Sequence, residues 1–133
     1  MSDEAQASAA ISPELRAFIY SCFDAVEQVE LLVLLHRSDE PCTAHAAAQA
    51  SGLGDAAARH HLETLAACGL LQVLVGDETT YRFAPKRTEL QTYADALVVA
   101  YGRSRTAIVR LVVTNPLRSA RRIAGAFTFR ERP

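Results

Sequence analysis

The chain has 133 residues, of which 50% are apolar, and a formal net charge of -1. This length and composition allow one globular domain with its own core, without disulfides or metal. The three cysteines, Cys22, Cys42 and Cys68, are odd in number and far apart, which excludes a disulfide framework and a zinc-finger spacing and favours a reducing cytoplasm. An acidic start and a short apolar run at residues 31–35 predict neither a signal peptide nor a membrane span, so no membrane partner is expected.

The charges are distributed unevenly along the chain. Residues 1–40 contain eight acidic and two basic residues, whereas residues 101–133 contain eight arginines and one glutamate. Two interpretations stay open. The two ends neutralise each other, within one chain or across a dimer, or the arginine-rich end meets phosphate or an acidic partner.

Residues 1–11 are small and polar without a period, which predicts a disordered leader before a single domain at residues 12–133. Ser12 is expected to cap a helix whose first residue is Pro13. Apolar residues at three-and-four spacing from Leu15 to Leu35 predict one long helix, or two helices broken near Asp24.

Two further helices are predicted in the next part of the chain. Thr43 is expected to cap a short helix at residues 44–51 that ends at Gly52. After a tight turn, Asp55 is expected to cap a helix that Gly69 closes. In this helix Ala58, Leu62 and Leu65 are expected to face inward.

The β-rich segments at residues 70–75 and 80–83 flank the turn sequence GDET and predict a hairpin that ends at Pro85. A heptad-like apolar stripe then predicts a long C-terminal helix, interrupted in its pattern by Ser104 and stopped before Pro116. So long a stripe exceeds what a small domain must cover, so we expect a homodimer, although the helix could also fold back on the N-terminal helix of its own chain. The expected dimerisation residues are Leu90, Ala94, Leu97, Tyr101, Ile108 and Leu111.

This order of elements predicts a mainly α fold with a small β-hairpin wing, a winged helix-turn-helix flanked by N-terminal and long C-terminal dimerisation helices. Residues 26–85 resemble the DNA-binding core of ArsR-type and MarR-type bacterial transcriptional regulators. The most specific match is His61-Leu62, Leu65 and Gly69-Leu70-Leu71, which is similar to the end of an ArsR-type recognition helix. The resemblance implies a DNA-binding core at residues 24–85, followed by a dimerisation helix and basic tail at residues 86–133. It also implies a homodimer that places one recognition helix per subunit in successive major grooves of double-stranded DNA.

On the helix around residues 55–68, three side chains that point away from its buried face are candidates for contact with base edges or phosphates: Arg59, His60 and Thr64. Near the hairpin, Arg82, Lys86 and Arg87 are candidates for contact with the DNA backbone. The resemblance suggests that His61 is packed. Asp77 and Glu78 at the wing tip are the wrong charge for tracking phosphate. The alternative function is therefore a winged-helix module that binds protein and not DNA.

Other chemistry has less support. The cysteine pair that metal-sensing ArsR-type proteins carry before the recognition helix has no counterpart, although Cys42 and His45 are spaced as ligands. No phosphate loop, nucleophile elbow or paired-carboxylate motif is present, so neither an enzyme nor a cofactor is expected. The sequence identifies no residue set for a small-molecule effector, for which the expected place is between the N-terminal and C-terminal helices. The tail at residues 117–133 is expected to dock on the partner subunit, with DNA and anionic membrane as alternatives.

Overall fold

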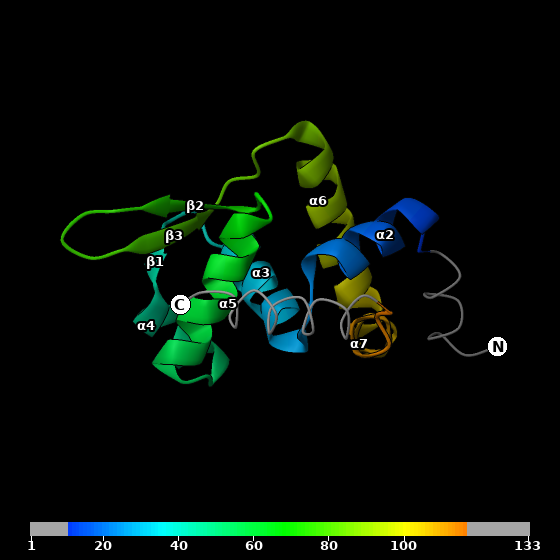
Figure 1. The fold of residues 1–133 in the computed structure, drawn as a ribbon, viewed down its shortest axis with the longest axis horizontal. Coiled ribbons are helices and arrows are strands. Elements are labelled where there is room, and N and C mark those ends of the chain that lie inside the picture. The colour runs from blue at the N-terminus through cyan, green and yellow to red at the C-terminus, as the bar shows by residue number, and fades with distance from the viewer. Residues whose placement is uncertain (1–10, 117–133) are drawn as a thin grey trace, which may run out of the picture.

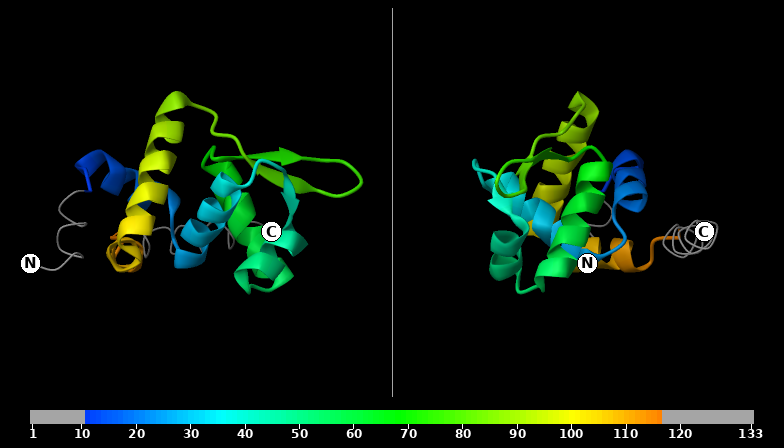
Figure 2. Two further views of the ribbon diagram at one scale, coloured as in Figure 1. Left: turned by 180° about the vertical axis from the view of Figure 1, so that it is seen from behind. Right: turned by 60° about the vertical axis from the view of Figure 1, so that its left-hand side comes forward.

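The computed structural model describes residues 11–116 and consists of helices and one small sheet (Figure 1). In Figures 1 and 2 the sheet and two helices, α4 and α5, lie at one end of the molecule, and α2, α6 and α7 lie at the other, with α3 between them. The elements are α2 (Pro13–Cys22), α3 (Val26–Arg37), β1 (Cys42–Thr43), α4 (Ala44–Ser51), α5 (Asp55–Ala67), β2 (Leu71–Leu74), β3 (Thr80–Phe83), α6 (Thr88–Arg103) and α7 (Arg105–Val113).

The N-terminal region forms two helices rather than one. The Ser12 hydroxyl caps α2 by accepting the amide hydrogen of Leu15 at 3.0 Å, as expected. Phe23 then takes an extended conformation and ends α2, and its side chain is fully buried. The apolar periodicity therefore runs on through the point at which the helix is broken. Ile11 is also buried, at 6% exposure, which corrects its assignment to the leader. The rest of the leader lies outside the described residues.

Helices α4 and α5 form the helix-turn-helix. Thr43 caps α4 by accepting the amide hydrogen of Ala46, and Gly52 ends it in a left-handed conformation with φ of 79°. The cap of α5 is Gly54 and not Asp55, which becomes the first helical residue. The Asp55 carboxylate instead accepts a hydrogen bond from His45 Nδ1 at 2.9 Å, which links the two helices.

The sheet has three antiparallel strands in the order β1-β3-β2. The hairpin formed by β2 and β3 confirms the predicted wing, with Val73 opposite Tyr81. The sequence pattern did not predict β1, in which Cys42 pairs with Tyr81 and Thr43 with Thr80. Since Thr43 also caps α4, the strand ties the wing to the start of the helix-turn-helix.

The C-terminal region is not the single long helix that the stripe predicted. Ser104 is extended, and its hydroxyl caps α7 by accepting the amide hydrogen of Ala107 at 3.2 Å. The capping preference of serine overrides the apolar repeat there, and α7 turns to pack on α2 and α3. Asn115, which is 5% exposed, fixes the end of this region by donating from Nδ2 to the carbonyls of Tyr20 and Phe23.

The core joins both ends of the molecule. Leu62 and Leu65 of α5 are fully buried, as predicted, in the same apolar cluster as Ile19 of α2 and Leu97 of α6. Within residues 11–116, no helix combines the length and apolar character needed to cross a bilayer. The basic tail lies outside the part of the chain that the structure describes.

Candidate nucleic-acid interface

Helix α5 has one buried and one exposed face, as its sequence pattern predicts. Ala58, Leu62 and Leu65 are fully buried, whereas Arg59 and His60 are exposed. Thr64 is partly buried, and its hydroxyl donates to the carbonyl of His60 at 3.1 Å. Because that bond stays within the helix turn, the oxygen of the hydroxyl remains available as an acceptor.

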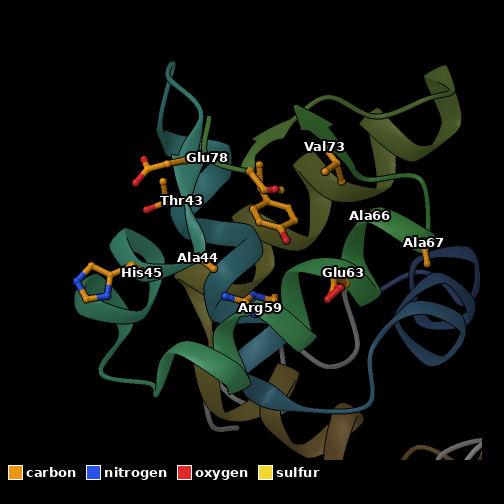
Figure 3. Close-up of a pocket in the computed structure, with 11 residues that line it drawn as sticks. Thr43, Ala44, His45, Arg59, Glu63, Ala66, Ala67, Val73 and Glu78 are labelled. Carbon is orange, nitrogen blue, oxygen red and sulfur yellow. The ribbon is translucent and has the colours of Figure 1, made fainter. Parts of the chain in front are cut away.

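An open groove of about 940 Å³ lies between the helix-turn-helix and the wing, and we call it the wing groove (Figure 3). It combines residues from the start of α4, one side of α5 and the facing hairpin. Its lining residues are Thr43, Ala44, His45, Arg59, Glu63, Ala66, Ala67, Val73, Glu78, Thr79 and Tyr81.

Arg59 is the predicted DNA-contact residue that lines this groove. Within residues 11–116, the close contacts between basic and acidic side chains join His36 to Asp95, His45 to Asp55 and Arg105 to Glu30, and none of them uses Arg59. Its guanidinium therefore has five donors on an exposed helix face with no carboxylate of the described chain bound to them.

The other predicted contact residues lie outside the wing groove. His60 is exposed on α5, and Arg82 is exposed on β3 beside the buried Tyr81. Lys86 and Arg87 are exposed in the segment before α6, where the amide of Lys86 donates to the carbonyl of Gly69 at 2.9 Å.

Two carboxylates that were not assigned to contacts line the groove. Glu63 follows Arg59 by one helical turn, and Figure 3 shows their side chains next to each other on α5. Glu78 approaches from the wing. The i and i+4 spacing of Arg59 and Glu63 placed both on one face, but the sequence did not show that the hairpin would fold over that face.

Two charged residues of α5 affect the pKa of Tyr81 in the wing. Burial raises the pKa of its phenol, Glu63 raises it further, and Arg59 lowers it. Tyr81 as a whole residue is 4% exposed. Opposite charges from α5 therefore converge on the base of the wing, and the groove has mixed rather than uniformly positive character.

His61 points away from this groove and is half-buried beside α3. Its Nδ1 lies 3.2 Å from Nε2 of Gln28, a side chain that is 2% exposed. Burial lowers the pKa of the His61 imidazole, and Glu27, His60 and Asp24 make smaller contributions. This position agrees with the expectation of a packed residue.

The predicted dimerisation stripe is largely covered by the chain itself. Its members Leu90, Ala94, Leu97 and Ile108 are between 0% and 7% exposed, on helices that pack against α2. Tyr101 and Leu111 keep part of their surface. Phe18 of α2 stacks on Tyr93 of α6 with ring centroids 5.5 Å apart, in the space where an effector was expected.

Cys42 and His45 were the spaced pair considered as metal ligands. His45 contacts Asp55, and Cys42 is partly buried, which raises the pKa of its thiol. Within residues 11–116, no group of three histidine, cysteine or acidic side chains is placed to hold a metal ion.

Solved structures show what this fold is similar to. No family model matches the sequence, and no curated protein matches it significantly. The crystal structure of RV1404 from Mycobacterium tuberculosis is 18% identical, with a TM-score of 0.52 over 90% of this chain and 81% of that one. The transcriptional regulator PA3341 is 21% identical, with a TM-score of 0.50 over 95% of this chain and 90% of that one.

The element order, the three-stranded sheet and these structural neighbours together define a winged helix-turn-helix fold. In this fold α5 is the second helix of the helix-turn-helix, which is the recognition helix in proteins of this fold that bind DNA, and the hairpin of β2 and β3 is the wing.

Proposed function

We propose that this protein is a dimeric, DNA-binding transcriptional regulator that reads the major groove with α5. The observation that carries the proposal is the exposed Arg59 side chain, which lies on the outer face of the recognition helix beside the wing and makes no ion pair within residues 11–116. The transcriptional regulator among the structural neighbours supports the same function.

The proposed contacts fall into two groups. Arg59, His60 and Thr64 meet base edges or adjacent phosphates, because an exposed helix face of this kind fits the major groove. Arginine matches the two acceptors of guanine with two parallel hydrogen bonds, so Arg59 is the main candidate for base recognition. The basic residues Arg82, Lys86 and Arg87 hold the DNA backbone and add affinity that does not depend on sequence.

A homodimer completes the proposed reader. Two copies would place their recognition helices in major grooves about 34 Å apart, one turn of the duplex. We propose that the partner contacts the outward surface of α6 and α7, where Tyr101 and Leu111 remain partly accessible and Val99 and Val113 are 54% and 53% exposed. The four buried members of the stripe would support this surface from inside the subunit.

The test is selection of bound fragments from genomic DNA by the purified full-length chain, followed by a salt titration of the best fragment. We expect one pseudo-palindromic site, and an affinity that falls steeply as salt releases counterions from the phosphates. Arg59→Ala should cost about 1–3 kcal/mol of binding free energy. Arg16→Ala, which removes an exposed arginine from α2, is the matched control and should change binding little.

The same experiment separates DNA binding from the protein-binding alternative. A winged-helix module that binds only protein would enrich no fragment even at low salt, and Arg59→Ala would then have no effect on DNA. Sedimentation of the complex gives the number of chains bound per site, and one chain per site would contradict the dimer.

A further inference from the structure

Glu63 lines the wing groove but has no role in the DNA contacts proposed above. It is exposed on α5 one helical turn after Arg59, and both residues line the groove. None of the ion pairs within residues 11–116 uses Glu63. Its carboxylate is therefore an acceptor to which no basic side chain of the described chain is bound. It lies on the face of α5 that we propose enters the major groove.

A carboxylate on this face restricts what the helix can bind. Its negative charge is repelled by the phosphates on both sides of the major groove, and it has no hydrogen to donate to guanine or thymine oxygens. Base edges offer one compensating partner of the right chemistry, an amino group. The N4 amino group of cytosine suits a carboxylate best, because the N6 amino group of adenine lies beside N7, whose lone pair repels a second acceptor.

Glu63 and Arg59 both lie close to the base of the wing. Tyr81 is almost fully buried at the base of the hairpin, and both Glu63 and Arg59 act on its phenol. Figure 3 shows the Glu63 and Arg59 side chains on the same side of α5, directed into the groove. The two charges thus face the same stretch of any duplex that occupies this surface.

We infer that Glu63 is a specificity-determining residue that accepts a hydrogen bond from a cytosine amino group while Arg59 binds a guanine. This inference rests on the proposed function. Four residues along a helix span about 6 Å, which corresponds to roughly two steps of the duplex. Each half-site should therefore contain a guanine that Arg59 binds and, about two base pairs away, a cytosine whose amino group Glu63 binds.

The experiment compares the sites that the full-length protein and its Glu63→Gln variant select from a random DNA library. Glutamine is nearly isosteric, but it both donates and accepts, so it pairs well with adenine. We expect the variant to change its preference from cytosine to adenine, or to lose it, at one position of each half-site. Affinity for the wild-type site should fall by about 5- to 150-fold, the range for one base-specific contact.

The control is Glu14→Gln, which removes the same charge from an exposed position of α2, at the other end of the molecule. It should leave every base preference unchanged. If the wild-type protein selects a site but Glu63→Gln keeps the same preference at all positions, the role of Glu63 is overturned and the proposed function stands. If the wild-type protein selects no site, both fail together.

Discussion

Gln28 of α3 and His61 of α5 are joined by a hydrogen bond of 3.2 Å whose direction is fixed by the neighbouring backbone. The Oε1 atom of Gln28 accepts the amide hydrogen of Asp24 at 2.8 Å, so its NH₂ group faces the imidazole. An NH₂ group only donates, and Nδ1 of His61 must therefore accept. The bond requires the neutral imidazole with its hydrogen on Nε2.

This arrangement predicts that the fold loses stability in mild acid through His61. Its folded pKa lies below the ordinary value of 6.5, mainly because the ring is desolvated. The unfolded chain therefore takes up the proton first. The contribution of His61 is complete above the unfolded pKa and is lost progressively as the pH falls through 6.5 toward the lower folded value. Urea unfolding at pH 7.5 and pH 5.5 measures this loss.

The control separates His61 from the other titrating groups. His61→Gln removes the proton-binding ring and should reduce the difference in unfolding free energy between the two pH values. His60→Gln removes the exposed neighbour and should leave most of that difference in place. Equal pH dependence in the wild-type protein and His61→Gln would refute the assignment.

Gly69 and Gly52 form a matched pair for testing the cost of a side chain after a helix. Both have positive φ, 84° and 79°. A Cβ atom at Gly69 would lie 3.1 Å from Cδ1 of Leu90, whereas none of the described atoms outside its chain neighbours lies within 4 Å of one at Gly52. We expect Gly52→Ala to cost about 1 kcal/mol of unfolding free energy, for backbone strain alone, and Gly69→Ala to cost more, up to about 3 kcal/mol. Chemical denaturation measures both, and equal costs would show that the contact with Leu90 relaxes freely.

We expect a substitution of Asn115 that keeps the shape of the side chain to destabilise the fold. Its Nδ2 atom donates to the carbonyls of Tyr20 and Phe23 at 2.9 Å and 3.2 Å. Asn115→Asp would place a buried carboxylate against two carbonyl oxygens, and we expect a loss of about 2–3 kcal/mol at neutral pH that becomes smaller in acid as the carboxyl group is protonated. The matched control is Gln49→Glu at an exposed position of α4, which should be nearly neutral. Thermal unfolding that is unchanged in Asn115→Asp would contradict the anchoring role.

The wing tip provides a test of where DNA lies if the proposed function holds. Asp77 is exposed at the tip, and its charge should repel phosphate within about 10 Å at moderate salt. Asp77→Lys should therefore raise affinity for the selected site and make the dependence of log affinity on log salt steeper by about 1–2. Glu14→Lys makes the same charge change on α2. Equal effects of the two variants would place the wing tip away from the DNA.

Local signals in the sequence were sufficient for the helix-turn-helix. Thr43 and Gly52 marked the start and the end of α4 in the sequence, because a hydroxyl cap and a left-handed glycine act within one turn of the chain. The three-and-four spacing of Ala58, Leu62 and Leu65 predicted the buried face of α5 for the same reason.

Features that depend on distant parts of the chain were not predictable in this way. β1 is two residues long and exists because it pairs with β3, about 40 residues later. At Ser104 the sequence offered both an apolar repeat and a serine cap; the structure forms the cap, and α7 packs on α2. The wing groove forms only when the hairpin lies beside α5, so the sequence did not show that Glu63 lines a groove.

The short strand β1 has a consequence for protein engineering. Thr43 belongs to the sheet through its pairing with Thr80 and to α4 through its cap, so the wing and the helix-turn-helix share a residue. Transplanting residues 55–67 alone into another scaffold would carry the side chains of α5 but separate them from the hairpin that faces them. Residues 42–83 keep β1, α4, α5 and the hairpin together, so this segment is a better unit of exchange in chimaeric proteins than α5 alone, provided that the scaffold replaces the packing of α3 against α5.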